Sequence, residues 1–116
     1  MRGDEERVVR AFADWLRREG WTVDTEVDFV DVCARRGGER MYAEAKGRTA
    51  AMGLDVDTMY GQLLRRMTDP ASGARYAVVV PTAGVLAALR VPAWVRERLD
   101  LEVYEVDERG AVHLRG

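Results

Sequence analysis

Apolar and polar residues alternate between Glu26 and Arg48, which predicts two β-strands joined by a tight turn at Gly37 and Gly38. Such a turn favours positive φ at both glycines and fixes which residues face each other. The predicted pairs are Arg36 with Glu39, Ala34 with Met41, Val32 with Ala43, Val30 with Ala45, Asp31 with Glu44, and Phe29 with Lys46. Because side chains alternate between faces, one face is apolar and the other gathers Asp31, Glu44 and Lys46.

Helical periodicity appears on both sides of this hairpin. Apolar residues at i, i+3, i+4 and i+7 spacing predict an amphipathic helix from Asp4 to Glu19, closed by Gly20. A second helix is predicted from Asp55 to Met67, with one apolar face made by Val56, Met59, Tyr60, Leu63 and Met67. Residues 82–89 are a short helix or a loop, and Pro92, at the first helical position, opens a helical turn through Leu99.

Further strands are predicted at residues 21–26, 76–80, 101–106 and 111–114. The run Tyr76 to Val80 is wholly apolar, as in a central strand covered on both faces. The resulting order is α-β-β-β-α-β-α-β-β. It predicts an α/β fold with a mixed β-sheet, a central β-hairpin and helices on both faces, formed by residues 1–116 as a single domain.

Composition narrows the class of protein. A hydrophobic content of 47% and a charged content of 33% are typical of a globular domain. The net charge of −2 means that any phosphate-binding surface has to be a local patch. The polar start of the chain is unlike a signal peptide, and the apolar stretch from Tyr76 to Trp94 is interrupted by Pro81, Gly84, Arg90 and Pro92. With one cysteine, Cys33, the sequence favours a cytoplasmic protein that spans no membrane.

The facing pair Asp31 and Glu44 calls for an explanation, because like charges across a strand pair destabilise a sheet. A divalent cation supplies one: Mg²⁺ or Mn²⁺ takes one or two protein carboxylates and fills its other positions with water and phosphate oxygens. Lys46 is the only lysine in a chain that otherwise uses arginine. A lysine on the same face is suited to orient or deprotonate an attacking water, or to balance charge on a pentavalent phosphorus.

The segments Asp31-Val-Cys-Ala and Tyr42-Ala-Glu44-Ala-Lys46-Gly47 resemble the Asp and Glu-X-Lys motifs of the PD-(D/E)XK phosphodiesterase superfamily, the restriction-endonuclease-like nucleases. The resemblance implies a restriction-endonuclease-like core with Asp31 and Glu44 as ligands of Mg²⁺ or Mn²⁺, the main-chain carbonyl of Ala45 as a further ligand, and Lys46 near the nucleophilic water. Val30 stands where a proline often precedes the aspartate. Asp28 is a rival aspartate, but in the predicted register it points away from Glu44.

Three more residues are candidates for the site. Glu5 falls in the apolar sector of the first helix, and the resemblance implies a helical glutamate near the metal; the alternative is an acid that favours the helix dipole. Tyr60-Gly-Gln62-Leu-Leu resembles a glutamine-bearing helix of the superfamily, although Gln62 could equally be an ordinary surface residue. Arg48, two residues beyond Lys46, is expected to touch a substrate phosphate.

Other polar and aromatic residues are read as structural. His113 is expected at the surface, and Cys33 is expected to pack on the Asp31 face without acting as a nucleophile. Arginines cluster at the hairpin tip, at Arg35, Arg36 and Arg40, and on the second helix, at Arg65 and Arg66. Arginine clusters can bind phosphates, but acids are interleaved with them, so they are read as a solvated surface. The three tryptophans lie at core-like spacings.

The sequence therefore predicts a Mg²⁺- or Mn²⁺-dependent endo- or exodeoxyribonuclease, with DNA favoured over RNA as the substrate. Cutting a duplex takes two active sites or two visits, so a homodimer or a larger assembly is expected. One alternative is a non-catalytic module of the same fold that binds nucleic acid or protein. Another is a general α/β domain in which Asp31, Glu44 and Lys46 lie exposed on an open sheet face.

Overall fold

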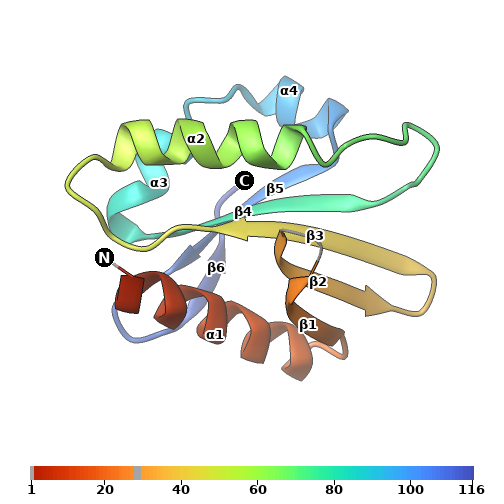
Figure 1. Ribbon diagram of the computed structural model, residues 1–116, viewed down its shortest axis with the longest axis horizontal. Coiled ribbons are helices and arrows are strands. Elements are labelled where there is room, and N and C mark those ends of the chain that lie inside the picture. The colour runs from red at the N-terminus through yellow and green to blue at the C-terminus, as the bar shows by residue number, and fades with distance from the viewer. Residues whose placement is uncertain (1, 28–29) are drawn as a thin grey trace.

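The computed structural model describes residues 2–27 and 30–116 of the chain, so the predictions for Asp28 and for the pairing of Phe29 with Lys46 lie outside the described residues. The elements are α1 (Arg2–Arg18), β1 (Thr22–Val27), β2 (Val30–Arg36), β3 (Glu39–Ala45), α2 (Met52–Leu64), β4 (Arg75–Pro81), η1 (Thr82–Gly84), α3 (Val85–Ala88), α4 (Ala93–Arg98), β5 (Leu101–Val106) and β6 (Val112–Leu114). Figure 1 shows the sheet between α1 on one side and α2 with α3 on the other. The predicted mixed α/β fold is confirmed.

The sheet has six strands in the order β1-β2-β3-β4-β5-β6. Strands β3, β4 and β5 run parallel, and the remaining neighbours are antiparallel. Parallel strands are normally covered on both faces, and residues Tyr76 to Pro81 of β4 are all buried. The prediction of a covered central strand at this run is therefore correct.

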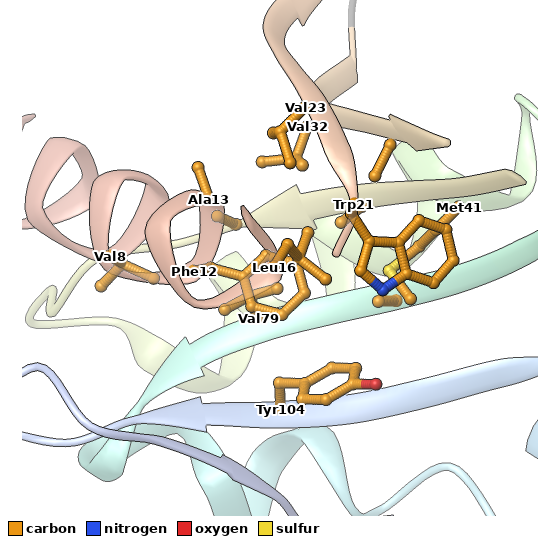
Figure 2. Close-up of a cluster of buried hydrophobic side chains, with 14 of the residues drawn as sticks. Val8, Phe12, Ala13, Leu16, Trp21, Val23, Val32, Met41, Val79 and Tyr104 are labelled. Carbon is orange, nitrogen blue, oxygen red and sulfur yellow. The ribbon is translucent and has the colours of Figure 1, made fainter. Parts of the chain in front are cut away.

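Alternation along the strands divides the core into two layers. Ala77 and Val79 of β4 pack toward α1, in a cluster that includes Phe12 and Leu16 (Figure 2). Tyr76, Val78 and Val80 pack instead against α2 and α3, in a cluster built on α2 by Val56, Met59, Tyr60 and Leu63. The apolar stripes of the two helices thus fix the sheet from opposite sides.

The hairpin of β2 and β3 has the predicted register from Arg36 opposite Glu39 to Val32 opposite Ala43. The predicted pairs of Asp31 with Glu44 and of Val30 with Ala45 lie beyond this last pair and are not part of the ladder. The apolar face of the hairpin is buried beneath α1, as expected. The turn geometry was only half right. Gly37 has φ +59, whereas Gly38 does not have a positive φ.

Several local predictions need correction. Helix α2 begins at Met52 instead of Asp55 and ends before Met67, which is only half-buried. Pro92 precedes α4 as its N-cap, because its ψ of 148° is extended and not helical. Trp94 is 63% exposed, so it is not a core residue, unlike Trp21. None of the helices in the described residues is long and apolar enough to cross a membrane.

Candidate active site

The predicted site residues lie where strands β2 and β3 separate. The last pair described in their ladder is Val32 with Ala43. Beyond this pair, the Asp31 side chain takes the place of a main-chain carbonyl of β2 as the hydrogen-bond acceptor. Its Oδ2 accepts a hydrogen bond of 2.8 Å from the Ala45 amide. Asp31 therefore holds the end of β3 and remains beside Glu44.

The main chain of Ala45 is directed toward this aspartate. The amide of Lys46 donates to the carbonyl of Val79 on β4, at 3.0 Å. Amide directions alternate along a strand, so the amide of Ala45 points the other way, toward β2. The amide and carbonyl of one residue in a strand lie on the same side. The Ala45 carbonyl thus points to the Asp31 side, as a main-chain metal ligand would need.

Glu44 is the most unusual side chain of the site. It is only 5% exposed, and its Oε1 has no hydrogen-bond partner. Burial, and after it the charge of Asp31 and a hydrogen bond with Asp31, together raise the pKa of the Glu44 carboxyl to about 8. A buried oxygen with no partner is costly, so this geometry suits a site that something else completes.

Glu105, the other buried carboxylate of the described residues, has a different environment. Its Oε2 accepts from the Thr82 hydroxyl at 2.6 Å, and its Oε1 accepts from Arg115 at 3.1 Å. Both of its oxygens are satisfied by the protein. The unpartnered oxygen of Glu44 is therefore a local feature and not a general property of buried acids in this fold.

Lys46 and Glu5 lie beside the acid pair. The Nζ of Lys46 is 3.8 Å from Oε1 of Glu5, which shows that this glutamate of α1 points at the hairpin, as its place in the helix predicted. Gly47 allows the approach: a Cβ there would lie 2.3 Å from the Glu5 amide nitrogen. The sequence prediction did not use Gly47, although a glycine directly after the Glu-X-Lys motif was a readable signal.

The site is not one flat sheet face. Asp31 lines a pocket of about 330 Å³ between α1 and β1, together with Glu5, Glu6 and Glu26. Lys46 also turns toward α1, whereas the positive charge of Arg66, just beyond α2, acts on Glu44. The prediction of a shared face was thus too simple, because the groups converge at the open end of the hairpin. The reading of all three as exposed on an open sheet face is wrong, since Glu44 is buried.

Arg66 was read from the sequence as solvated surface, but its positive charge acts on Glu44 and lowers the pKa of that carboxyl. Spacing along the chain did not show this proximity, because it depends on the packing of α2 against β3. Gln62 lies four residues earlier on α2 and is half-buried. Arg48 is exposed and lies elsewhere. It lines a smaller pocket of about 160 Å³ with Arg7 and Thr82, beyond the carboxyl ends of the parallel strands.

The main chain of Arg48 has a structural role. Its amide donates to the Asp4 carboxylate, and this hydrogen bond is the main cause that lowers the pKa of Asp4. The contact ties the loop after β3 to the first turn of α1. It therefore supports the position of Glu5 next to Lys46.

The donor set fits a hard divalent cation with few protein ligands. Within residues 2–27 and 30–116, no group of three or more histidine, cysteine, aspartate or glutamate side chains is placed to hold a metal. Two neighbouring carboxylates, one with an unpartnered buried oxygen, are nevertheless enough for Mg²⁺ or Mn²⁺, which keep several waters. Asp31, Glu44 and the carbonyl of Ala45 are the groups that would hold it.

The sequence predicts no catalytic role for His113 and Cys33. His113 is exposed and its Nε2 lies 2.9 Å from Asp107, far from the hairpin end. Cys33 is half-buried on the face opposite Val32 and Ala34. Neither residue offers a competing chemistry at the site.

Comparison with known proteins gives fold relatives. No family model matches the chain, and no curated protein matches it. It is similar to the crystal structure of an XisH family protein from Nostoc punctiforme, with a TM-score of 0.63 and 17% identity over 95% of this chain and 99% of that one. It is also similar to an fdxN element excision controlling factor protein from Anabaena variabilis, with a TM-score of 0.62 and 17% identity over 93% and 96% of the two chains. The similarity at this identity is one of fold.

Proposed function

We propose that this protein is a nuclease that uses Mg²⁺ or Mn²⁺ to hydrolyse phosphodiester bonds in DNA. The observation that carries the proposal is the buried, unpartnered Oε1 of Glu44 beside Asp31, with Lys46 at the same hairpin end. The resemblance of these residues to the PD-(D/E)XK motifs supports it. One fold relative is described as a controlling factor of element excision, which agrees with DNA as the substrate.

The cation, when bound, supplies a Lewis acid that lowers the pKa of a water and neutralises phosphate charge. In the reaction the water gives up a proton to solvent and its oxygen bonds to phosphorus in line with the leaving oxygen. The bond between phosphorus and the leaving oxygen breaks, and the leaving oxygen takes up a proton from solvent, so that the protons balance. Lys46 orients the water and stabilises the charge that develops on phosphorus. Glu5, 3.8 Å from the Lys46 ammonium, holds this side chain at the site.

Cleavage of linear, branched and single-stranded DNA with Mn²⁺ tests the proposal, with metal binding followed by calorimetry. We expect Lys46→Ala to lower the rate by about 10²- to 10⁴-fold while metal binding persists. Arg98→Gln, on α4 at the β5 side of the sheet, is the matched control and should keep full activity. A parent protein that neither binds metal nor cuts any of these substrates would refute the proposal.

A second candidate function is a non-catalytic nucleic-acid-binding module of the same fold. It is favoured by the protonated Glu44 expected at neutral pH from a pKa of about 8, because a proton shared with Asp31 could replace the metal. Tight DNA binding by the parent protein without any cleavage would support this module.

Light scattering of the free and DNA-bound protein tests the proposed homodimer.

A further inference from the structure

We infer that the face of the β2–β3 hairpin opposite α1 binds the DNA backbone, with Arg35 and Arg40 as phosphate contacts some distance from the bond that is cut. This inference deepens the proposed function, on which it rests for the location of the cut. Neither arginine is one of the motif residues.

The register places the two arginines directly opposite each other, Arg35 on β2 and Arg40 on β3. Like charges at facing positions destabilise a strand pair. Both side chains are exposed, and no ion pair of the Arg40 guanidinium is found within the described residues. Arg35 has one weak partner, Asp24, at 3.5 Å. A polyanion lying across the pair would turn this repulsion into attraction.

Arg36 shows that the hairpin tip is not a uniform solvated cluster. It lies on the α1 face, where its guanidinium stacks 4.5 Å from the Trp21 ring centroid and donates to the Glu19 carbonyl at 3.0 Å. Its role is to close the core. Arg35 and Arg40 have no such packing role, which leaves them available for a ligand.

The two arginines are continuous with the candidate active site. Arg40, Tyr42 and Glu44 follow one another on the same face of β3, and Arg35, Cys33 and Asp31 do so on β2. Helix α2 contacts β3 and β4, while β1 and β2 lie beyond β3 from it (Figure 1). Asp31, Cys33 and Tyr42 are accordingly only half-buried, so the path from the arginines to Asp31 is open to solvent.

The spacing suits a nucleic-acid strand. Glu44 lies four residues beyond Arg40 on β3, which is ~13 Å along the strand. One strand of duplex DNA rises about 3.4 Å per nucleotide, so this length corresponds to about four nucleotides. Arginine forks match phosphate oxygens bidentately, and they would fix the register of the strand on the protein without reading its sequence.

The test measures binding without cleavage. A fluorescein-labelled 30-base-pair duplex is titrated in EDTA with the parent protein, with the double variant Arg35→Gln/Arg40→Gln and with the control Arg98→Gln, over a series of salt concentrations. Each phosphate contact contributes about 0.9 to the slope of log affinity against log salt. We expect the double variant to lose about 1.8 of this slope and to bind roughly tenfold more weakly at low salt, whereas Arg98→Gln matches the parent.

The outcomes separate this inference from the nuclease proposal. Unchanged affinity and slope in the double variant, or no DNA binding by the parent, would overturn the inference. Weaker binding by the double variant together with a parent that never cuts DNA in Mn²⁺ would uphold the surface and reject the nuclease. If the double variant does not fold, Arg40→Gln alone decides, because its exposed guanidinium should still account for about 0.9 of the slope.

Discussion

Replacing the buried glutamate of the site with glutamine should stabilise the protein in a pH-dependent way. The unfolded chain releases the Glu44 proton near its ordinary pKa of 4.5, whereas the folded protein keeps it up to about pH 8. Between these values the folded state binds more protons than the unfolded state, so the free energy of unfolding falls as pH rises. At about 1.4 kcal/mol per pH unit, the loss is at most about 5 kcal/mol.

Glu44→Gln removes this penalty and keeps the shape of the side chain. Denaturant melts from pH 5 to pH 9 should show the two proteins closest at pH 5, with the advantage of the variant growing until about pH 8 and then staying constant. The other buried carboxylate is the matched control. Glu105→Gln loses a bond to Arg115 and should destabilise the protein by about 1 kcal/mol. Equal effects of both substitutions, or a Glu44→Gln variant less stable than the parent at pH 8, would contradict the role assigned to burial.

Metal should reverse the effect. A cation at the acid pair favours the ionised carboxylates, so Mn²⁺ at one hundred times its dissociation constant should stabilise the parent by about 2.7 kcal/mol. If the Mn²⁺ concentration is instead fixed at one hundred times the dissociation constant of pH 8, the stabilisation should be smaller at pH 6, because binding must displace the Glu44 proton and the dissociation constant is larger there. Glu44→Gln should show little of this gain. If Mn²⁺ stabilises both proteins equally, it binds elsewhere.

Three other predictions concern packing and the lone lysine. Gly47→Ala should destabilise the protein by about 1–3 kcal/mol in denaturant melts, since the new methyl group meets the backbone of α1 at Glu5. Lys46→Arg should fold normally by circular dichroism yet stay well below parent activity in the cleavage assay, because guanidinium cannot reproduce a compact ammonium; full activity would remove the argument from the single lysine. Phe12→Ala should cost about 3–5 kcal/mol, because this fully buried ring packs 5.0 Å from that of Tyr104.

The parts of the fold that the sequence predicted are those set by local rules. The register of β2 and β3 follows from a short turn and from alternation, and α1 follows from a stripe with a 3.6-residue period. The prediction that Trp94 lies at a core-like position was wrong. Spacing identifies an apolar stripe but does not say whether another element covers it. Helix α4 has no buried residue, and its Trp94 remains at the surface.

The parts of the site that the sequence did not predict depend on contacts between distant segments. The charge of Arg66 acts on Glu44 only because α2 packs across β3. A glycine is needed at position 47 only because the first turn of α1 lies against it. The early end of the β2–β3 ladder is equally invisible in the sequence. There the aspartate carboxylate takes the place of a main-chain acceptor, which alternation cannot anticipate.

One register supports both the site and the proposed DNA surface. Slipping β2 by one residue would turn Asp31 and Arg35 into the core beneath α1 and expose Val32 and Ala34 in their place. The apolar layer under α1 strongly opposes such a slip, because it would bury two charges and expose valine and alanine side chains. The packing that stabilises the fold thus also keeps the two acids and the two arginines on a common path. For this reason the arginine substitutions can test the surface without disturbing the hairpin that carries the acids.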